Sequence, residues 1–426
     1  MATAIDDLKN FLDHSPTALH AAKEMATRLA LKDYIPLQEK GQWHLEAGKN
    51  YFVSRNGSFC AFRMPSQIIE QYIIFAAHTD SPALKIKPNP EITKDNMSLL
   101  ATELYGGPLL SSWLNRDLGI AGKIVIKNKT GAIEEKLIFI DETPVIIPQL
   151  AIHLDRDVNE KGPLLNKQEH LQALVGLNLP KGLVLQTLIR KRCSFDELLS
   201  FDLFLTPIEQ ARCTGMNGEF LSSYRIDNLA SVHAATTAFG SCIKSPKHTL
   251  QMMICWDHEE IGSKTWEGAY GTFFDDVRAR IIEASSMTVE QNLIAKSKSL
   301  CISLDMAHAM HPGHEARHDP QHTPLLGKGI AVKYNASHKY ATSASSAAFI
   351  HAQCQNLHLQ HQSFISRSDM SCGSTVGPIS AHHLGIETVD IGCPQLSMHS
   401  TREMLACQDY TDMCVFLTHV IQNERV

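Results

Sequence analysis

Three absences limit what this 426-residue chain can be. Its 39 basic side chains face 45 acidic ones, so it lacks the basic excess that nucleic acids and anionic membranes attract. No uninterrupted apolar run reaches the roughly 18 residues that span a bilayer, and the first 25 residues lack the apolar core of a signal peptide. We therefore expect a protein that binds neither nucleic acid nor membrane.

The eleven cysteines include no Cys-x-x-Cys pair, which excludes a zinc ribbon. Most of them lie in apolar strings such as MMICW, where a reduced thiol behaves as a small hydrophobe. Disulfide frameworks belong to short secreted chains, so the cysteines predict a reducing, cytoplasmic location.

The pattern of residues along the chain changes near residue 88 and returns to the earlier pattern near residue 224. Between these points the segment AGKIVIKNKTGAIEEKLIFI alternates β-branched and polar residues around a turn at Lys129-Thr130-Gly131, as a hairpin does. The length exceeds that of one ordinary domain. We predict an α/β catalytic domain with a mixed sheet, made of residues 1–87 and 225–426, that a β-rich domain at residues 88–224 interrupts.

The outer parts of the chain predict both strands and helices. Leu8, Phe11 and Leu12 recur at helical spacing, and Ser15-Pro16 is typical of the start of a second helix. Other runs are apolar at nearly every position, which favours strands covered on both faces. These runs are QYIIFAAHTD, TLQMMICWD, SLCISLDM and ETVDIG.

Histidine and acidic residues follow several of these strands. They are His78, Asp80, Glu259, Glu260, Asp305 and His399, together with Asp227 at a predicted helix start. Ligands bind beyond the carboxyl ends of strands in open α/β sheets, so we expect one shared site. Imidazole and carboxylate are zinc ligands, and two ions about 3.5–4 Å apart need a shared carboxylate. The pattern predicts two zinc ions that activate a water molecule.

The adjacent glutamates have different expected roles. Successive side chains of an extended segment point in different directions, so Glu260 can bind metal while Glu259 serves as general base. Asp80 is placed to accept a hydrogen bond from the free ring nitrogen of His78. The plain alternatives are a solvated acidic strand end for the glutamates and a helix cap for Asp227.

Five ordered segments also resemble a known family. AAHTDSP, RIDNL, DHEEIGS, SLDMAHAMHP and PQLSMHSTREM are similar to the signature segments of the aspartyl aminopeptidase family of dinuclear zinc exopeptidases. The resemblance implies a metallo-aminopeptidase with two zinc ions per subunit that removes N-terminal residues, preferentially Asp or Glu. It implies that His78 and Asp305 bind one zinc and that Glu260 and His399 bind the other. It likewise implies that Asp227 bridges the two ions and that Glu259 is the base.

The resemblance extends to assembly and specificity. It implies dimers formed through the inserted domain, gathered into a tetrahedral homododecamer, with His153 reaching a neighbouring active site to stabilise the oxyanion. Lys333 matches the lysine of the family's acidic pocket. Separately, Gly373 and Ser374 lie in a turn at a predicted helix start, whose N–H groups could hold a carboxylate.

Several alternatives remain open at this point. Lys333 and His153 could be ordinary surface residues. The histidine-rich segment 307–322 has no consistent ligand period, but it leaves room for an inactive metal-binding scaffold. The same metal chemistry could also serve an aminopeptidase that prefers neutral residues, a carboxypeptidase or an N-deacylase.

Overall fold

The computed structural model describes residues 3–423 and contains three sheets. The largest is a mixed sheet of nine strands in the order β1-β2-β3-β13-β4-β14-β18-β16-β17. Its strands are β1 (Ile35–Pro36), β2 (Asn50–Arg55), β3 (Ser58–Arg63), β13 (Thr249–Trp256), β4 (Gln71–His78), β14 (Leu300–Leu304), β18 (Glu387–Gly392), β16 (Ile330–Tyr334) and β17 (His361–Ile365). The four central strands β13, β4, β14 and β18 run parallel, so their carboxyl ends lie along one edge.

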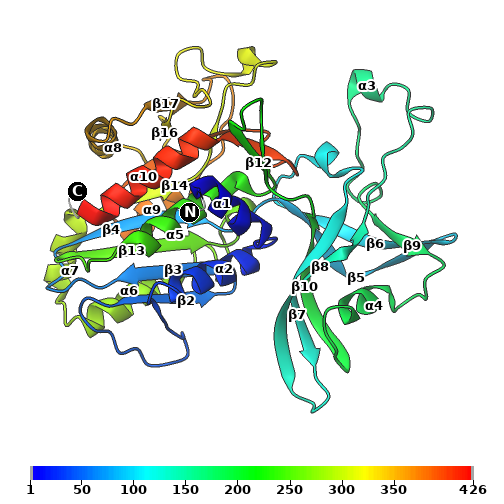
Figure 1. The fold of residues 1–426 in the computed structure, drawn as a ribbon, viewed down its shortest axis with the longest axis horizontal. Helices are drawn as coiled ribbons and strands as arrows, with labels where there is room; N and C mark the ends of the chain where they lie inside the picture. The colour runs from blue at the N-terminus through cyan, green and yellow to red at the C-terminus, as the bar shows by residue number, and fades with distance from the viewer. Residues whose placement is uncertain (1–2, 424–426) are drawn as a thin grey trace.

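Helices cover both faces of this sheet, as Figure 1 shows. One face packs against α1 (Ala4–Asp13), α2 (Ala18–Ala30), α5 (Ile226–Ser241), α8 (Ala344–Asn356) and α10 (Cys407–Asn423). The other face packs against α6 (Phe273–Ala284), α7 (Val289–Ser297) and α9 (Val376–Leu384). The sequence of β4 is apolar throughout because both of its faces are buried. Phe75 faces the first helical layer, whereas Ile74 faces the second.

The α/β fold with a mixed sheet was predicted correctly, but the second helix begins later than expected. Thr17, rather than Ser15, is the residue that caps α2, and its hydroxyl accepts a hydrogen bond from the N–H of His20 at 3.5 Å. Leu8, Phe11 and Leu12 are buried in α1 as their spacing predicts.

A second sheet of six antiparallel strands forms a separate mass to the right in Figure 1. Its order is β8-β7-β10-β5-β6-β9, with β8 (Ile133–Val145), β7 (Leu118–Lys127), β10 (Glu197–Pro207), β5 (Ala83–Lys94), β6 (Met97–Tyr105) and β9 (Ala173–Leu177). We call residues 83–207 the β-rich lobe. It also holds α3 (Val158–Lys161), α4 (Val184–Arg190) and the 3-10 helix η1 (Leu110–Trp113). The hairpin between β7 and β8 turns at Gly131, whose φ of 86° suits glycine.

A third, five-stranded sheet connects distant parts of the chain. It consists of β11 (Arg212–Thr214), β12 (Phe220–Ser223), β20 (Glu403–Ala406), β19 (Pro394–Leu396) and β15 (Ala307–His308). Strands β11 and β12 lie within residues 88–224, yet β12 pairs with β20 near the C-terminus rather than with the six-stranded sheet.

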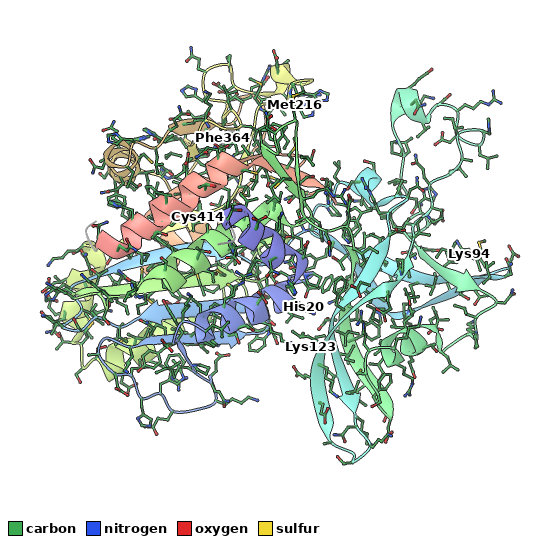
Figure 2. The ribbon with its side chains drawn as sticks, viewed as in Figure 1. His20, Lys94, Lys123, Met216, Phe364 and Cys414 are labelled. Atoms are coloured by element: carbon green, nitrogen blue, oxygen red, sulfur yellow. The ribbon has the colours of Figure 1, made fainter. Side chains whose placement is uncertain are left out.

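The β-rich lobe touches the helical layers of the large sheet. Helix α2 contacts β7, and Figure 2 shows the labelled His20 and Lys123 at this junction. Nζ of Lys123 donates a hydrogen bond to Oδ1 of Asn56, between β2 and β3, at 3.1 Å. Among residues 3–423, no helix combines the length and the apolar character needed to cross a membrane.

Candidate metal centre

Three parallel strands of the large sheet deliver acidic and histidine side chains to one edge. His78 is the last residue of β4, and Asp305 directly follows β14. Glu259 and Glu260 form the short 3-10 helix η2 (Glu259–Ile261) just beyond β13. Because β4 lies between β13 and β14, these side chains meet at the centre of the sheet.

Two further side chains arrive from outside these strands. Asp227 lies in the first turn of α5 and is joined to Asn228 by a cis peptide bond. His399 lies between β19 and β20. Glu403 holds both segments: its carboxylate accepts hydrogen bonds from the N–H of Asp227 at 2.9 Å and from the N–H of His399 at 2.6 Å. A single buried carboxylate therefore fixes the distance between the two segments.

The ligand atoms of five predicted residues form two groups with Asp227 in common. One group is His78, Asp227 and Asp305, the other is Asp227, Glu260 and His399, and within each group the atoms lie within 4.8 Å of one another. Nε2 of His78 is 3.5 Å from Asp227 and 3.6 Å from Asp305. Nε2 of His399 is 3.4 Å from Asp227 and 3.3 Å from Glu260.

The charges in these groups demand a cation. Burial raises the pKa of Glu260 to about 7, even though His399 opposes the shift. Burial lowers the pKa of His399, but Asp227 and Glu260 outweigh it and raise that pKa to about 11. In the same way, Asp227, Asp305 and Asp80 raise the pKa of His78 against the effect of burial. Facing carboxylates in a buried place attract positive charge, whether a proton or a metal.

The two groups suit zinc by their chemistry and by their free atoms. Oδ1 of Asp227 and Oε1 of Glu260 are buried and make no well-aligned hydrogen bond within the described residues, although Nε2 of His78 lies 3.5 Å from the first and Nε2 of His399 3.3 Å from the second. A buried carboxylate oxygen without a partner is costly unless a cation binds it. Imidazole and carboxylate together are the donors that catalytic zinc sites use.

Glu259 lies beside these groups rather than in either of them. Its ligand atom forms a third group with His78 and Glu260, within 4.8 Å. Burial raises the pKa of Glu259 to about 8, with His78 acting in the opposite direction. A carboxyl group whose pKa lies near neutral pH can both take up and release a proton there.

Asp80 has more contacts than the sequence suggested. The carbonyl oxygen of Asp80, rather than its carboxylate, lies nearest the free ring nitrogen of His78, at 3.1 Å, while its carboxylate is 3.4 Å away. The two carboxylate oxygens instead accept hydrogen bonds from the N–H groups of Glu259 at 3.1 Å and Glu260 at 3.0 Å. Asp80 therefore positions both glutamates as well as the histidine.

A cavity of about 420 Å³ opens over these residues. Its lining consists of His78, Asp227, Glu259, Glu260, Asp305, Met306, His308, Lys333, Tyr340, Gly373, Ser374, Thr375, Met398 and His399. Lys333, on β16, is only 2% exposed, and its Nζ lies 3.2 Å from Oδ2 of Asp305 and 5.3 Å from the ring centre of Tyr340. It is therefore a buried lysine beside the predicted metal ligands and not a surface residue.

Gly373 and Ser374 lie where the sequence places a helix start. They precede Thr375, the residue that caps α9, and Thr375 also contacts Asp390 through its hydroxyl at 2.6 Å. The backbone of this turn forms one wall of the cavity.

Two sequence features lie away from the cavity or only touch it. His153 is exposed in the β-rich lobe and is not among the described residues that line the cavity. Of the histidine-rich segment 307–322, His308 lines the cavity, whereas His311 and His314 are exposed. Within residues 3–423, this segment contributes no histidine to a group of three metal-ligand atoms.

Several residues of the site were not predicted. Tyr340 and Met398 line the cavity, Glu403 holds the segments of Asp227 and His399, and Tyr105 donates a hydrogen bond to Asp80 at 2.7 Å. Tyr105 lies at the end of β6 and begins the segment YGGPLLSSWLNRDLGIAGKI, which also resembles the aspartyl aminopeptidase family. Glu403 lies within the segment PQLSMHSTREM, so the resemblance to the family covers this residue without indicating its role.

Comparisons with known proteins find relatives that match almost the whole chain. The family described as "Aminopeptidase I zinc metalloprotease (M18)" matches residues 11–419. A probable M18 family aminopeptidase 2 of Pseudomonas paraeruginosa is 38% identical over 415 residues, which cover 94% of this chain and 94% of that protein. A protein of the same description from Clostridium novyi is 38% identical over 422 residues, covering 96% and 97%.

Solved structures share the whole fold. A chain in the cryo-EM structure of the Ape4 and Nbr1 complex is similar with a TM-score of 0.93 and 32% identity, over 99% of this chain and 86% of that one. The M18 family aminopeptidase of Thermotoga maritima is similar in fold, with a TM-score of 0.86 and 24% identity, over 98% of this chain and 95% of that one.

Proposed function

Because this chain belongs to the M18 family of zinc metallo-aminopeptidases, we propose that it removes N-terminal Asp and Glu from peptides at a dinuclear zinc centre. In this proposal His78 and Asp305 hold one zinc ion, Glu260 and His399 hold the other, and Asp227 bridges them. The observation that carries it is the pair of ligand groups that share Asp227 beside a buried lysine.

The chemistry divides between the metal and the chain. When bound, a pair of zinc ions lowers the pKa of water and polarises the scissile carbonyl. Glu259 accepts the proton of the attacking water at its carboxylate and gives it to the leaving amine. Asp80 holds the backbone of Glu259 by a hydrogen bond of 3.1 Å, so the base keeps its direction while its proton moves.

Lys333 supports the preference for acidic residues. Its ammonium carries three donors, lies in the same cavity as Glu259, and is almost fully buried. A hydrogen bond between charged groups contributes about 1.5–3 kcal/mol, which is about a ten- to over a hundredfold preference over neutral residues. Gly373 and Ser374 offer backbone N–H groups on the adjoining wall.

A peptide panel tests the reaction. Peptides that begin with Asp, Glu or Leu are compared with acetylated versions and with versions whose C-terminus is amidated. We expect cleavage of free Asp and Glu termini, loss of cleavage on acetylation, and no effect of amidation. Cleavage from the C-terminal end would establish a carboxypeptidase, release of acetate an N-deacylase, and no hydrolysis at all an inactive scaffold.

The variant Lys333→Met tests the specificity. Removing the ammonium should lower kcat/KM for Asp and Glu peptides by about ten- to a hundredfold and leave the slow cleavage of Leu peptides unchanged. Lys339→Met, at an exposed position six residues later, is the control and should retain the preference. A Lys333→Met enzyme that still favours Asp, or a wild type that prefers Leu, would contradict the assignment.

The same proposal includes the domain division and the assembly. We propose that residues 88–224 form an inserted domain that makes dimers, that the dimers build a homododecamer, and that His153 acts in a neighbouring active site. Supporting this, the segment around His153 exposes large apolar side chains that a partner would cover. They are Leu150 at 58%, Ile152 at 45%, Leu154 at 75% and Leu164 at 83% exposed.

The cysteines support a cytoplasmic location. All eleven are free, and six of them are buried, so the fold relies on none of them for a cross-link. A chain with this many free thiols suits a reducing compartment.

A further inference from the structure

The segment Tyr105–Gly107 of the β-rich lobe touches the candidate metal centre. This segment ends β6 and precedes η1. The hydroxyl of Tyr105 donates a hydrogen bond to Oδ2 of Asp80 at 2.7 Å. The carbonyl oxygen of Gly107 lies 3.1 Å from Nδ1 of His399. A single short segment of the lobe therefore reaches both sides of the site.

On the first side, Tyr105 acts through one carboxylate. The oxygen of Asp80 that accepts from Tyr105 also accepts from the N–H of Glu260 at 3.0 Å, and the other oxygen accepts from the N–H of Glu259. The ring of Tyr105 is itself held by the lobe, since it packs edge-on against Phe204 of β10 at 5.5 Å between ring centres. The hydroxyl thus ties the backbone of both glutamates to the lobe.

On the second side, the lobe selects the tautomer of His399. A carbonyl oxygen only accepts hydrogen bonds, so Nδ1 must carry the proton that faces Gly107. In the neutral ring that binds a metal, Nε2 is then the unprotonated nitrogen, and it points at Asp227 and Glu260, 3.4 and 3.3 Å away. The N–H of Leu109 also donates to the carbonyl of His399 at 2.8 Å, which fixes the loop that carries the imidazole.

Gly106, between the two contacts, lies so close to Glu260 that a side chain there would push Glu260 by a few tenths of an ångström. Its φ is +68°, and a Cβ there would be 3.2 Å from Cβ of Glu260 and 3.3 Å from its carbonyl oxygen. The backbone of the lobe therefore packs directly against the backbone of a predicted ligand. This close approach is possible only while the lobe is docked on the large sheet.

We propose that Tyr105–Gly107 is a positioning segment for the zinc ligands, so that zinc affinity depends on the docking of the β-rich lobe. The inference rests on the proposed ligand set. Contacts of this kind, which orient a ligand without touching the metal, typically change metal affinity about 10- to 100-fold when they are removed.

The first test compares two tyrosine variants by zinc affinity alone, measured by competition with a zinc chelator in the absence of substrate. Tyr105→Phe removes only the hydroxyl that holds Asp80 and should weaken zinc binding about 10- to 100-fold. Tyr34→Phe is the control, because the hydroxyl of Tyr34 makes a buried hydrogen bond to the carbonyl of Phe239 at 3.0 Å, and neither residue is among those that line the cavity. Equal affinities in the two variants would overturn the positioning role.

The second test adds one methyl group at each of two glycines and removes no hydrogen-bonding group. Gly106→Ala and Gly131→Ala both place a Cβ at a positive φ, of +68° and +86°, but the Cβ at residue 131 would meet nothing within 4 Å. Backbone strain is therefore present in both variants, whereas the added methyl group crowds Glu260 only in Gly106→Ala. We expect zinc affinity to fall in Gly106→Ala and to stay at the wild-type value in Gly131→Ala; an equal response would refute the proposal.

The two proposals fail in different ways. A wild-type protein that binds no zinc, or that keeps its zinc in the variant His399→Ala, would overturn the ligand set and the positioning role together. Tight zinc binding that His399→Ala weakens and Tyr105→Phe does not would overturn the positioning role alone.

Discussion

At the scale of single residues, a change at Glu259 distinguishes zinc binding from the catalytic step. Glu259→Gln keeps the size of the side chain and removes its ability to take a proton. We expect kcat to fall about 10²- to 10⁴-fold, while the zinc content, measured by elemental analysis, stays at the wild-type level. Glu209→Gln, in the chain between β10 and β11, serves as the control. A Glu259→Gln enzyme within a few fold of the wild-type rate would mean that another group is the base.

The residues of the site differ in how far the sequence reveals them. Those that follow a strand, such as His78 and Asp305, were predictable because parallel strands bring their carboxyl ends to one edge. Lys333 could not be placed inside the cavity by pattern alone, because a lysine in an apolar strand is more often exposed at its tip. Tyr105 bonds to Asp80, 25 positions away, and Glu403 bonds to Asp227, 176 positions away, and no local period records such contacts.

At the scale of elements, a series of hydrogen-bonded polar side chains links four helices of one layer, and no sequence pattern predicts it. Asp7 of α1 accepts a hydrogen bond from Arg28 of α2 at 2.7 Å and lies 3.1 Å from Nε2 of His233 in α5. Nδ1 of His233 in turn forms a short hydrogen bond with the hydroxyl of Tyr410 in α10. This series of hydrogen bonds runs from the partly exposed Asp7 to the buried Tyr410.

Replacing Asp7 should destabilise this layer in a pH-dependent way. Hydrogen bonds from His233 and Arg28 lower the pKa of Asp7 below its ordinary value of 3.8, although burial opposes them. Because the folded-state pKa is the lower one, the stabilisation is present above pH 3.8 and is lost as the pH falls through the folded-state value. Asp7→Asn should therefore cost about 1 kcal/mol at pH 7, allowing for the partial exposure of Asp7.

Urea unfolding of metal-free protein at pH 7 and at pH 3 measures this effect without interference from zinc loss in acid. The difference between wild type and Asp7→Asn should shrink at pH 3. Asp33→Asn, at an exposed position just after α2, should show no such change. A destabilisation of equal size at both pH values would place its cause in packing rather than in charge.

The elements themselves were predicted best where their period is strong. The alternate burial of β4 and the apolar face of α1 follow directly from their sequences. The start of α2 was misplaced because Ser15-Pro16 is typical of a helix start, and the hydroxyl of Thr17 makes the capping bond instead. The pairing of β12 with β20 joins residues that are about 180 positions apart, which no local signal indicates.

At the scale of the whole molecule, the proposed role of His153 requires two subunits for one active site. This can be tested by complementation, since the two variants His153→Ala and Glu259→Gln should each be inactive alone. In a mixed dimer, the subunit with an intact Glu259 would receive His153 from its neighbour. Co-expression of the two variants should then restore about a quarter of the wild-type activity, because half of the random dimers are mixed and each has one complete site.

Sedimentation of the same samples provides the control for assembly. We expect species larger than a monomer, and a full loss of activity when dilution yields monomers. Co-expressed variants that stay inactive, or a monomer with full activity, would contradict the action of His153 in a neighbouring subunit.

The order of strands in the large sheet also determines when the enzyme becomes active during its synthesis. Strand β4 lies between β13 and β14, so His78 pairs with Trp256 and Ile73 with Leu300. The cavity also needs His399, whose N–H bonds to Glu403, and both residues are synthesised well after β4, β13 and β14. Such distant pairings form slowly. A nascent chain that still lacks residues 399–403 therefore has no complete cavity, so we expect hydrolysis to begin only after these residues have emerged and folded.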